Sequence, residues 1–110
     1  MFKKFFTGIK IRVLKTLKKN RGYFNIAGIK MYLDFLDPID RELITTQKYE
    51  EKEINFIKKL YNLYQFEYFL DVGANCGYYS VKLATEFKKL KVIAFEPNTE
   101  AFFKFKNTMK

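Results

Sequence analysis

The feature that most constrains this chain is a short apolar run that leads into a glycine turn and then into a helix. Residues Tyr68–Val72 predict a strand, and Gly73 and Gly77 bound the turn that follows it. Glycine adopts backbone angles that other residues rarely reach, and it lets a ligand approach the main chain. The first amides of the next helix point into the turn with partial positive charge. This pattern favours an α/β fold with a ligand site at the turn.

A second apolar strand follows about one strand–helix–strand unit later. Residues Lys91–Phe95 form a continuous apolar run, as expected for a parallel strand that is covered on both faces. Asp71 lies near the end of the first strand, and Glu96 follows the second strand 25 positions further along. Neighbouring parallel strands would place both carboxylates at the C-terminal edge of the sheet, where open α/β sheets bind ligands.

The turn and the end of the second strand carry two motifs, DVGANCGYY at Asp71–Tyr79 and AFEPN at Ala94–Asn98. Together they resemble the FkbM family of S-adenosylmethionine-dependent methyltransferases. The stretch Met31–Asp40 and the pair Tyr49-Glu50 are similar to the segments that precede these motifs in that family. The likeness spans roughly residues 22 to 110, which correspond to the front of the family's domain.

The resemblance implies the N-terminal part of a Rossmann-like class I methyltransferase domain with S-adenosyl-L-methionine as cofactor. It also implies O-methylation of a sugar or natural-product hydroxyl, so the acceptor would be a small molecule or a glycan. Six residues are the expected cofactor site: Asp71, Gly73, Asn75 and Gly77 at the amino acid end, Glu96 at the ribose, and Glu50 near the pocket. No catalytic base can be assigned, because such bases come from later strands in folds of this kind.

Other interpretations of the same residues stay open. Gly73 and Gly77 also suit an ordinary turn, Asp71 can cap a helix, and Glu96 can be a solvated strand end. Glu50 in the first turn of a helix suits the helix dipole. It is the combination of two strand-end acids with a glycine turn that favours cofactor binding.

A nicotinamide dinucleotide is the alternative adenosine cofactor. The dinucleotide fingerprint needs glycine at its first, third and sixth positions. Here these positions hold Gly73, Asn75 and Tyr78, so two of the three do not fit. S-adenosylmethionine has no phosphate, and its cationic amino acid end can lie near Asp71.

Basic charge is concentrated at the start of the chain. The net charge is +9, and residues 1–30 contain nine lysines and arginines and no acid. From Phe2 to Lys19 the apolar residues recur at helical spacing, which predicts a basic amphipathic helix. This helix can lie on an anionic membrane, bind an acidic partner or pack on the domain, and the chain could then be a non-catalytic interaction module. Its aromatic residues lie on the apolar side, which disfavours nucleic acid as a partner.

The remaining elements divide the chain into three segments: the basic helix at 1–21, a hairpin and helical lead-in at 22–65, and the start of the methyltransferase-like domain at 66–110. Strands are expected at Tyr23–Ile26 and Ile29–Leu33, around Ala27-Gly28. Helices are expected at Ile39–Thr45, Tyr49–Tyr64, Gly77–Lys89 and Thr99–Met109. The expected buried face of the helix at 49–64 is Ile54, Ile57, Leu60, Tyr61 and Tyr64, and that of the helix at 77–89 is Tyr79, Leu83, Phe87 and Leu90. In the helix at 99–109 the expected buried residues are Phe102, Phe105 and Met109. Asn98 is expected to cap this last helix.

Composition sets further bounds. The chain has one cysteine, Cys76, and no histidine, so neither an internal disulfide nor a Cys/His metal site is expected. Cys76 is read as a small residue that fits a crowded turn. No run approaches the roughly 18 apolar residues of a membrane span, so the expected location is cytoplasmic, with membrane-peripheral contact through residues 1–21 as an option. Two parallel strands would leave an apolar edge unpaired. We therefore expect a truncated enzyme that is weakly stable and inactive alone, with its oligomeric state open.

Overall fold

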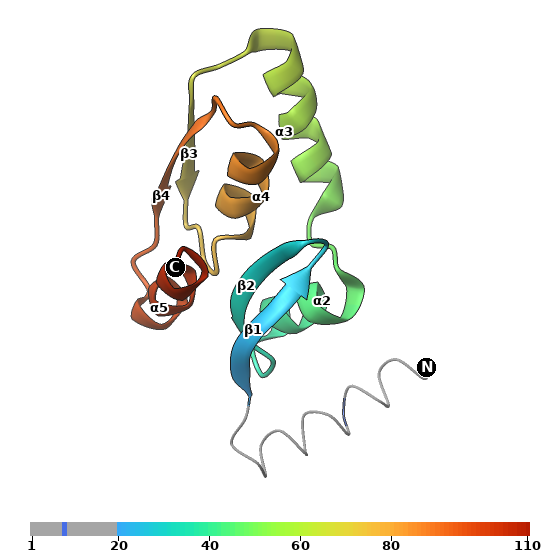
Figure 1. Ribbon diagram of the computed structural model, residues 1–110, viewed down its shortest axis with the longest axis vertical. Helices are drawn as coiled ribbons and strands as arrows, with labels where there is room; N and C mark the ends of the chain where they lie inside the picture. The colour runs from blue at the N-terminus through green and yellow to red at the C-terminus, as the bar shows by residue number, and fades with distance from the viewer. Residues whose placement is uncertain (1–7, 9–19) are drawn as a thin grey trace.

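The computed structural model describes Gly8 and residues 20–110, so the helix expected at Phe2–Lys19 lies, apart from Gly8, outside the described residues. The elements follow in the order β1 (Arg21–Ile26), β2 (Ile29–Asp34), α2 (Pro38–Thr46), α3 (Glu51–Tyr64), β3 (Tyr68–Val72), α4 (Tyr78–Glu86), β4 (Lys91–Phe95) and α5 (Thr99–Thr108) (Figure 1). They form an α/β arrangement with two small sheets. In the described part of the chain, no helix has the length and apolar character to cross a membrane.

The predicted hairpin is confirmed. Strands β1 and β2 pair antiparallel, with Ile26 opposite Ile29. The two turn residues, Ala27 and Gly28, both have positive φ angles, of 47° and 90°. Such angles match the twist of the flanking strands, which is why short hairpin turns favour glycine. The Gly28 amide donates to the Asn25 side chain at 2.8 Å and closes the turn.

Helix α2 begins where its sequence provides a cap. The Asp37 carboxylate accepts hydrogen bonds from the amides of Ile39 and Asp40, at 2.9 and 3.1 Å. Pro38 occupies the first helical position, where a missing amide hydrogen costs nothing. This capped helix packs on the hairpin and supplies Leu43 to its core.

The core under the hairpin includes residues from the glycine turn. Its buried members are Ile26, Met31, Leu33, Leu43, Ile54, Cys76 and Tyr78. Cys76 and Tyr78 belong to the turn after β3 and to the start of α4. The segments 22–65 and 66–110 therefore share one hydrophobic core.

The second sheet consists of β3 and β4, which pair parallel as predicted. Asp71 lies opposite Ala94, and Val72 opposite Phe95, so both strands end at the same edge. Helices α3 and α4 lie on one side of these strands (Figure 1). A second core cluster joins Tyr61 of α3 and Leu83 of α4 to Leu90, with Phe69 and Val92 of the strands packed against it.

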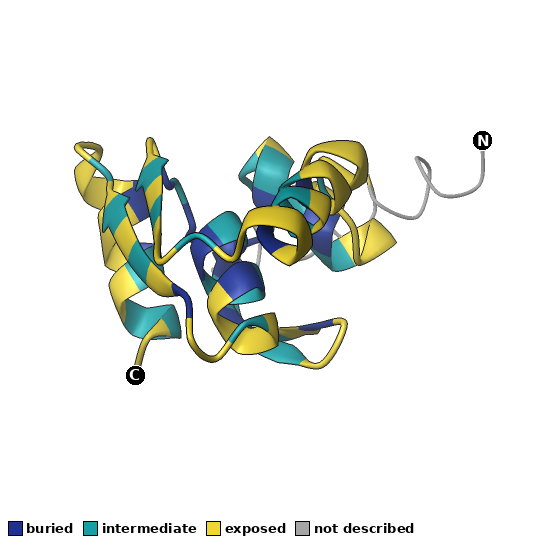
Figure 2. Ribbon diagram, turned by 90° about the horizontal axis from the view of Figure 1, so that it is seen from above, coloured by how far each residue is buried: buried dark blue, intermediate teal, exposed yellow. Residues whose placement is uncertain are grey.

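The other face of this sheet corrects the expectation that β4 is covered on both sides. Burial alternates along both strands, as the striped colouring of the ribbon shows (Figure 2). On the outer face Leu70 is 57% exposed, Val72 79%, Ile93 43% and Phe95 51%. The apolar run of β4 is compatible with burial of both faces, but in the described residues helices cover only the inner face.

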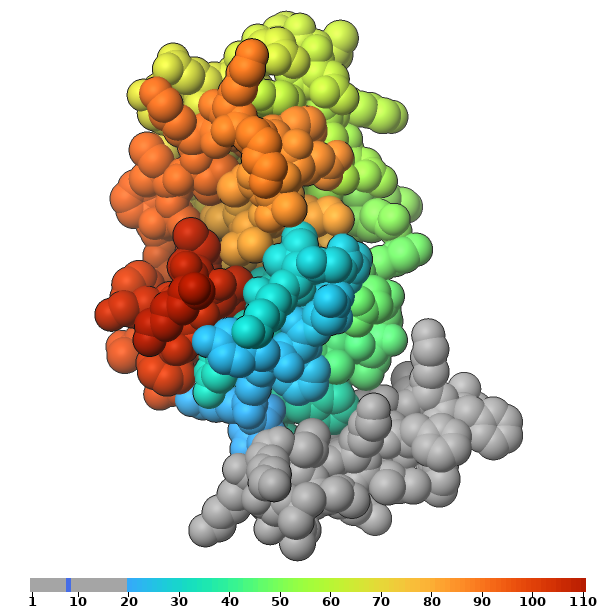
Figure 3. Space-filling model, viewed as in Figure 1, coloured from blue at the N-terminus to red at the C-terminus, as the bar shows by residue number. Residues whose placement is uncertain are grey.

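Helix α5 also differs from its expected orientation. Asn98 caps it as predicted, since its side chain accepts from the Ala101 amide. The expected buried stripe is wrong, however, because Phe102 and Met109 are 51% and 68% exposed while Ala101 and Lys104 are buried. The reason is that α5 lies against the hairpin (Figure 3), where the Thr108 hydroxyl accepts from the Tyr32 amide. In this position the Lys104 ammonium meets the carboxylates of Asp37 and Asp40, which turns its side chain inward.

Two smaller corrections concern α3 and α4. Tyr64, expected on the buried face of α3, is 73% exposed because it lies in the last turn beyond the second core. Helix α4 ends at Glu86 and not at Lys89, with Phe87 at its C-cap in an extended conformation. The shorter helix lets Leu90 turn back into the core, where it is 6% exposed.

Candidate functional site

The turn between β3 and α4 is tied to the end of β4. The amides of Gly73 and Ala74 both donate to the Phe95 carbonyl, at 2.8 and 3.0 Å. Three residues of the turn have positive φ: Gly73 at 79°, Asn75 at 54° and Gly77 at 89°. This geometry explains both glycines, and asparagine is among the few other residues that adopt it readily.

A cleft of about 350 Å³ opens over this turn. It is lined by four of the six predicted site residues, Glu50, Asp71, Gly73 and Asn75, and by three tyrosines, Tyr49, Tyr78 and Tyr79. The structure therefore brings the Tyr49-Glu50 segment, which precedes α3, to the end of β3. Sequence spacing alone did not indicate that these three tyrosines line one cleft, because aromatic residues are common throughout this chain.

Both carboxylates of the cleft have one hydroxyl partner. The Ser80 hydroxyl donates to Oδ2 of Asp71 at 2.6 Å. The Tyr79 hydroxyl donates to Oε2 of Glu50. Burial, and then this bond to Glu50, raise the pKa of the Tyr79 phenol, so Tyr79 stays a neutral donor at physiological pH. In each case one oxygen of the carboxylate carries the internal bond, and the second can accept from a ligand.

The charge of this cleft is negative. Its lining includes the carboxylates of Glu50 and Asp71 and neither lysine nor arginine. Carboxylates and the faces of aromatic rings both attract cations. In the described residues, no group of acidic, cysteine or histidine side chains is arranged to hold a metal ion. The cleft is therefore suited to an organic cation.

Glu96 lies at the same edge of the sheet but lines a second cleft, of about 410 Å³. Its carboxylate accepts the Asn75 amide at 2.7 Å through Oε1 and the Asn98 amide at 2.8 Å through Oε2. Gly73 and Asn75 line both clefts, so the two meet at the turn. Asp71 and Glu96 thus flank this turn from different sides.

Gly77 has a packing role in this structure. It is buried and lines neither of these two clefts. A Cβ atom at this position would come within 2.2 Å of the Phe105 ring of α5. Together with a φ of 89°, this close contact accounts for glycine without a ligand.

Cys76 is part of the core under the turn. Its side chain is almost fully buried. Burial, and next the nearby negative charge of Asp40, raise the pKa of the thiol to about 12. The thiol therefore stays protonated near neutral pH and acts as a small apolar residue, which agrees with the interpretation from sequence.

Two charged residues behind the turn were missed by the sequence reasoning. Asp40 is fully buried, and Lys104, which also lines the second cleft, is 4% exposed. The residues are 64 positions apart, so no local pattern could pair them. The sequence shows Lys104 between two phenylalanines of α5, but a lysine on a helix is ordinarily solvated, so this position did not indicate a buried charge.

Comparisons of the chain with models of known protein families, with curated proteins and with solved structures found no match. The α/β arrangement comes from the structure itself, and the methyltransferase family stays a prediction from the motifs.

Proposed function

We propose that the chain binds S-adenosylmethionine across the two clefts, as the cofactor-binding part of a methyltransferase. The observation that carries this proposal is a cleft with two carboxylates and no basic residue, at the C-terminal edge of two parallel strands. The cofactor has an ammonium and a sulfonium group, which suit such a cleft. It also has a ribose diol, which suits the free lone pairs of the nearby Glu96.

Each end of the ligand has partners of matching chemistry. The ammonium would lie by the free oxygens of Asp71 and Glu50. The ligand's carboxylate would lie at the N-terminal end of α4, where helix amides carry partial positive charge. The diol would reach Glu96 on the far side of Gly73 and Asn75, the residues that both clefts share.

The same charges disfavour a nicotinamide dinucleotide. Its pyrophosphate would meet the carboxylates of Glu50 and Asp71, and like charges in a partly buried site repel strongly. The side chain of Asn75 also stands where a dinucleotide turn has glycine. The electrostatics of the first cleft therefore favour the adenosyl amino acid, whereas the second cleft is lined by Arg21 and Lys104 as well as by acids.

For the reaction, the sulfonium supplies a methyl group that transfers by in-line displacement. The described residues would contribute binding and orientation, which account for most of the catalysis of such a transfer. The proposed acceptor is a sugar or natural-product hydroxyl, as the motif resemblance implies. No described residue is assigned as the general base that a hydroxyl acceptor can need.

Calorimetric titration with S-adenosylhomocysteine, S-adenosylmethionine and NAD tests the proposal. We expect the first two to bind and NAD to bind at least tenfold more weakly. Asp71→Asn and Glu96→Gln should each weaken binding by about 10- to 100-fold, the range for a hydrogen bond to a charged group. The control is Glu42→Gln, an exposed acid on α2 that lines neither cleft.

Two results would contradict the proposal. One is preferential binding of NAD, and the other is full affinity for S-adenosylhomocysteine in both cleft variants. Turnover is a separate measurement, with labelled S-adenosylmethionine and mixed sugar acceptors. We expect binding without robust turnover from this chain alone, because no described residue supplies the base.

A further inference from the structure

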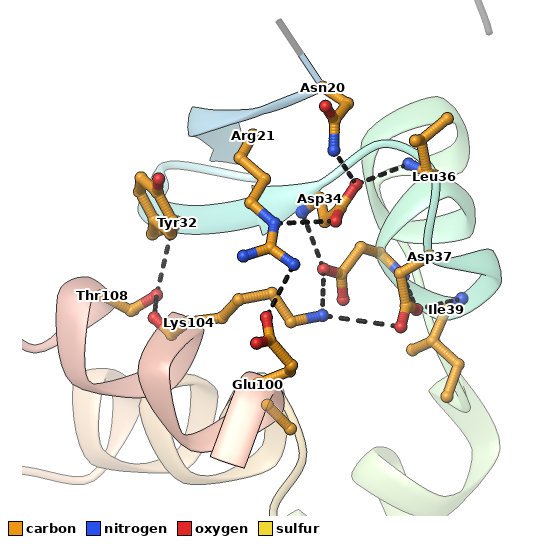
Figure 4. Close-up of polar contacts among 12 residues, drawn as sticks. Asn20, Arg21, Tyr32, Asp34, Leu36, Asp37, Ile39, Glu100, Lys104 and Thr108 are labelled. Atoms are coloured by element: carbon orange, nitrogen blue, oxygen red, sulfur yellow. Dashed lines mark hydrogen bonds and ion pairs between the residues drawn. The ribbon is translucent and has the colours of Figure 1, made fainter. Parts of the chain in front are cut away.

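A buried ion pair lies behind the proposed ligand turn, which is residues 73–77 between β3 and α4, and joins α5 to α2 (Figure 4). The Lys104 ammonium lies 2.5 Å from Oδ2 of Asp40 and 3.5 Å from Oδ2 of Asp37. Asp40 has no exposed side-chain surface, and the Lys104 side chain is 5% exposed. Burying two charges is expensive unless their geometry is good and further hydrogen bonds satisfy them. Because this pair is buried, solubility does not explain the two charges, and a structural role must be sought.

Asp40 and its partner connect α2 to two other parts of the molecule, the hairpin and the turn. Oδ2 of Asp40 also accepts the Asp34 amide of β2 at 2.8 Å. Its partner Lys104 lines the second cleft together with Gly73 and Asn75, so the pair lies beside the turn. Oδ1 of Asp40 has no hydrogen-bond partner among the described residues. The pair thus lies between the hairpin, α2 and the turn.

Lys104 connects the pair through α5 to two positions of the turn, Gly77 and Asn75. At Gly77, the Phe105 ring of this helix fills the space beside the glycine. At Asn75, the backbone amide is held by Glu96, which lies two residues before the α5 cap Asn98 and also accepts the Asn98 amide. A shift of α5 would therefore move the contacts at both Asn75 and Gly77.

Other bonds between α5 and the hairpin are more exposed. Glu100 binds Arg21 at 2.7 Å, with side chains that are 69% and 38% exposed. The Thr108 hydroxyl accepts from the Tyr32 amide at 2.9 Å in a partly buried contact. Exposed ion pairs contribute little and are screened by salt. Among these polar contacts, the Lys104–Asp40 pair is the one that solvent and salt reach least.

We infer that Lys104 and Asp40 are positioning residues for the ligand turn. Their pairing holds α5 against α2, so that Glu96 meets the Asn75 amide and Phe105 lies under Gly77. The consequence for ligand affinity rests on the proposed function, whereas the effect on the turn does not. Asp40 lines neither cleft and Lys104 borders only the second, and both act through the backbone of the turn.

The first experiment follows the turn without a ligand. Amide hydrogen exchange is measured by NMR for Asn75, whose amide is held by Glu96, in the full chain and in Lys104→Met. We expect exchange of the Asn75 amide to accelerate at least tenfold in the variant. Lys106→Met, an exposed lysine of the same helix, is the matched control and should leave this exchange unchanged.

The double variant Asp40→Asn with Lys104→Met separates position from stability. It removes both charges, so no unpaired charge stays buried, and it keeps an oxygen for the Asp34 amide. Unfolding in urea should return close to the wild-type midpoint, while the Asn75 amide still exchanges at least tenfold faster. If the double variant restores both properties, or if Lys104→Met leaves the exchange unchanged, the inference is wrong.

Titration with S-adenosylhomocysteine completes the test. We expect at least tenfold weaker binding by the double variant than by the wild type. If the wild type does not bind while the exchange results hold, the proposed function fails and the positioning role stands. If the wild type binds and the double variant binds equally well with unchanged Asn75 exchange, the positioning role fails and the proposed function stands.

Discussion

The two sheets of this molecule have the same number of strands but differ in how well they are covered. In the hairpin unit, Met31, Leu33 and Leu43 have no exposed surface. In the parallel sheet, Leu70 and Val72 are more than half exposed on the outer face. The hairpin is closed by the short helix α2, which follows it directly in sequence, together with α5. A parallel pair needs helices on both faces, and here one face has them.

The glycine turn between β3 and α4 lies where these two regions meet, and this position explains its properties. Its backbone is bonded to the end of β4 in the open sheet, whereas Cys76 and Tyr78 are buried in the hairpin core. The hairpin core thus holds the side chains of a turn whose backbone is bonded to the parallel sheet. A turn with preset backbone angles binds a ligand without the entropic cost of ordering it.

The largest expected effect comes from the same substitution made in each region. Leu43→Ala should lower the free energy of unfolding by about 2–5 kcal/mol, because it leaves a cavity in a closed core. Leu70→Ala should change it by less than about 0.5 kcal/mol, since most of that side chain is already in water. Urea unfolding followed by circular dichroism measures both. Equal losses would mean that the two regions are packed alike.

A smaller effect is expected at the glycines that lie in the two turns. Gly77→Ala should lower the free energy of unfolding by about 2–3 kcal/mol, from the positive φ and from the clash with Phe105. Gly28 has an almost identical φ of 90°, but a Cβ atom there would meet open space. Gly28→Ala should therefore lower the free energy of unfolding only by the backbone strain, about 1 kcal/mol. The difference between the two melting curves isolates the packing of α5 on the turn. Equal losses would place Phe105 away from Gly77.

The outer face of the parallel sheet should affect association more than stability. Val72→Lys places a charge on a side chain that is 79% exposed, so the free energy of unfolding should change by less than about 0.5 kcal/mol. Exposed apolar strands with unpaired edges promote association, and a lysine there opposes it. Sedimentation velocity at increasing protein concentration should show less association for Val72→Lys than for the wild type. Lys88→Ala, an exposed position outside the outer face, is the control.

The elements that depend on local sequence were predictable. The strand at Tyr68–Val72 has the predicted bounds because turn residues follow the apolar run. The hairpin followed from Ala27-Gly28, and the start of α5 from Asn98, since each is set by backbone angles or by a cap within a few residues. The parallel pairing of β3 and β4 followed from their spacing.

The properties that depend on distant contacts were not predictable. The sequence shows Phe102 and Lys104 only as neighbours on a helix, and the hairpin decides which of them is buried. The cleft is a mixed case. The meeting of Asp71, Gly73 and Asn75 follows from one local motif, but the meeting of Glu50 with Tyr79 depends on how α3 approaches α4. The family assignment and the cofactor stay predictions.

The smallest expected effect concerns the acid sensitivity of the closed region. Burial alone would raise the pKa of Asp34, but hydrogen bonds from Asn20, Arg21 and the Leu36 amide outweigh it and lower the pKa below 3.8. A carboxylate whose pKa is lower in the folded state stabilises that state at pH values above its pKa in the unfolded chain. This stability is lost as the pH falls through its pKa in the folded state. Unfolding curves for the wild type should therefore shift to lower urea concentration as the pH decreases below about 4.

Asp34→Asn should remove part of this dependence. The variant should be less stable than the wild type at pH 7, and the two should approach each other as the pH falls through the lowered pKa of folded Asp34. Glu42→Gln, an exposed acid of α2, should keep the wild-type slope. If Asp34→Asn kept the full slope, the acid sensitivity would have to arise from other carboxylates.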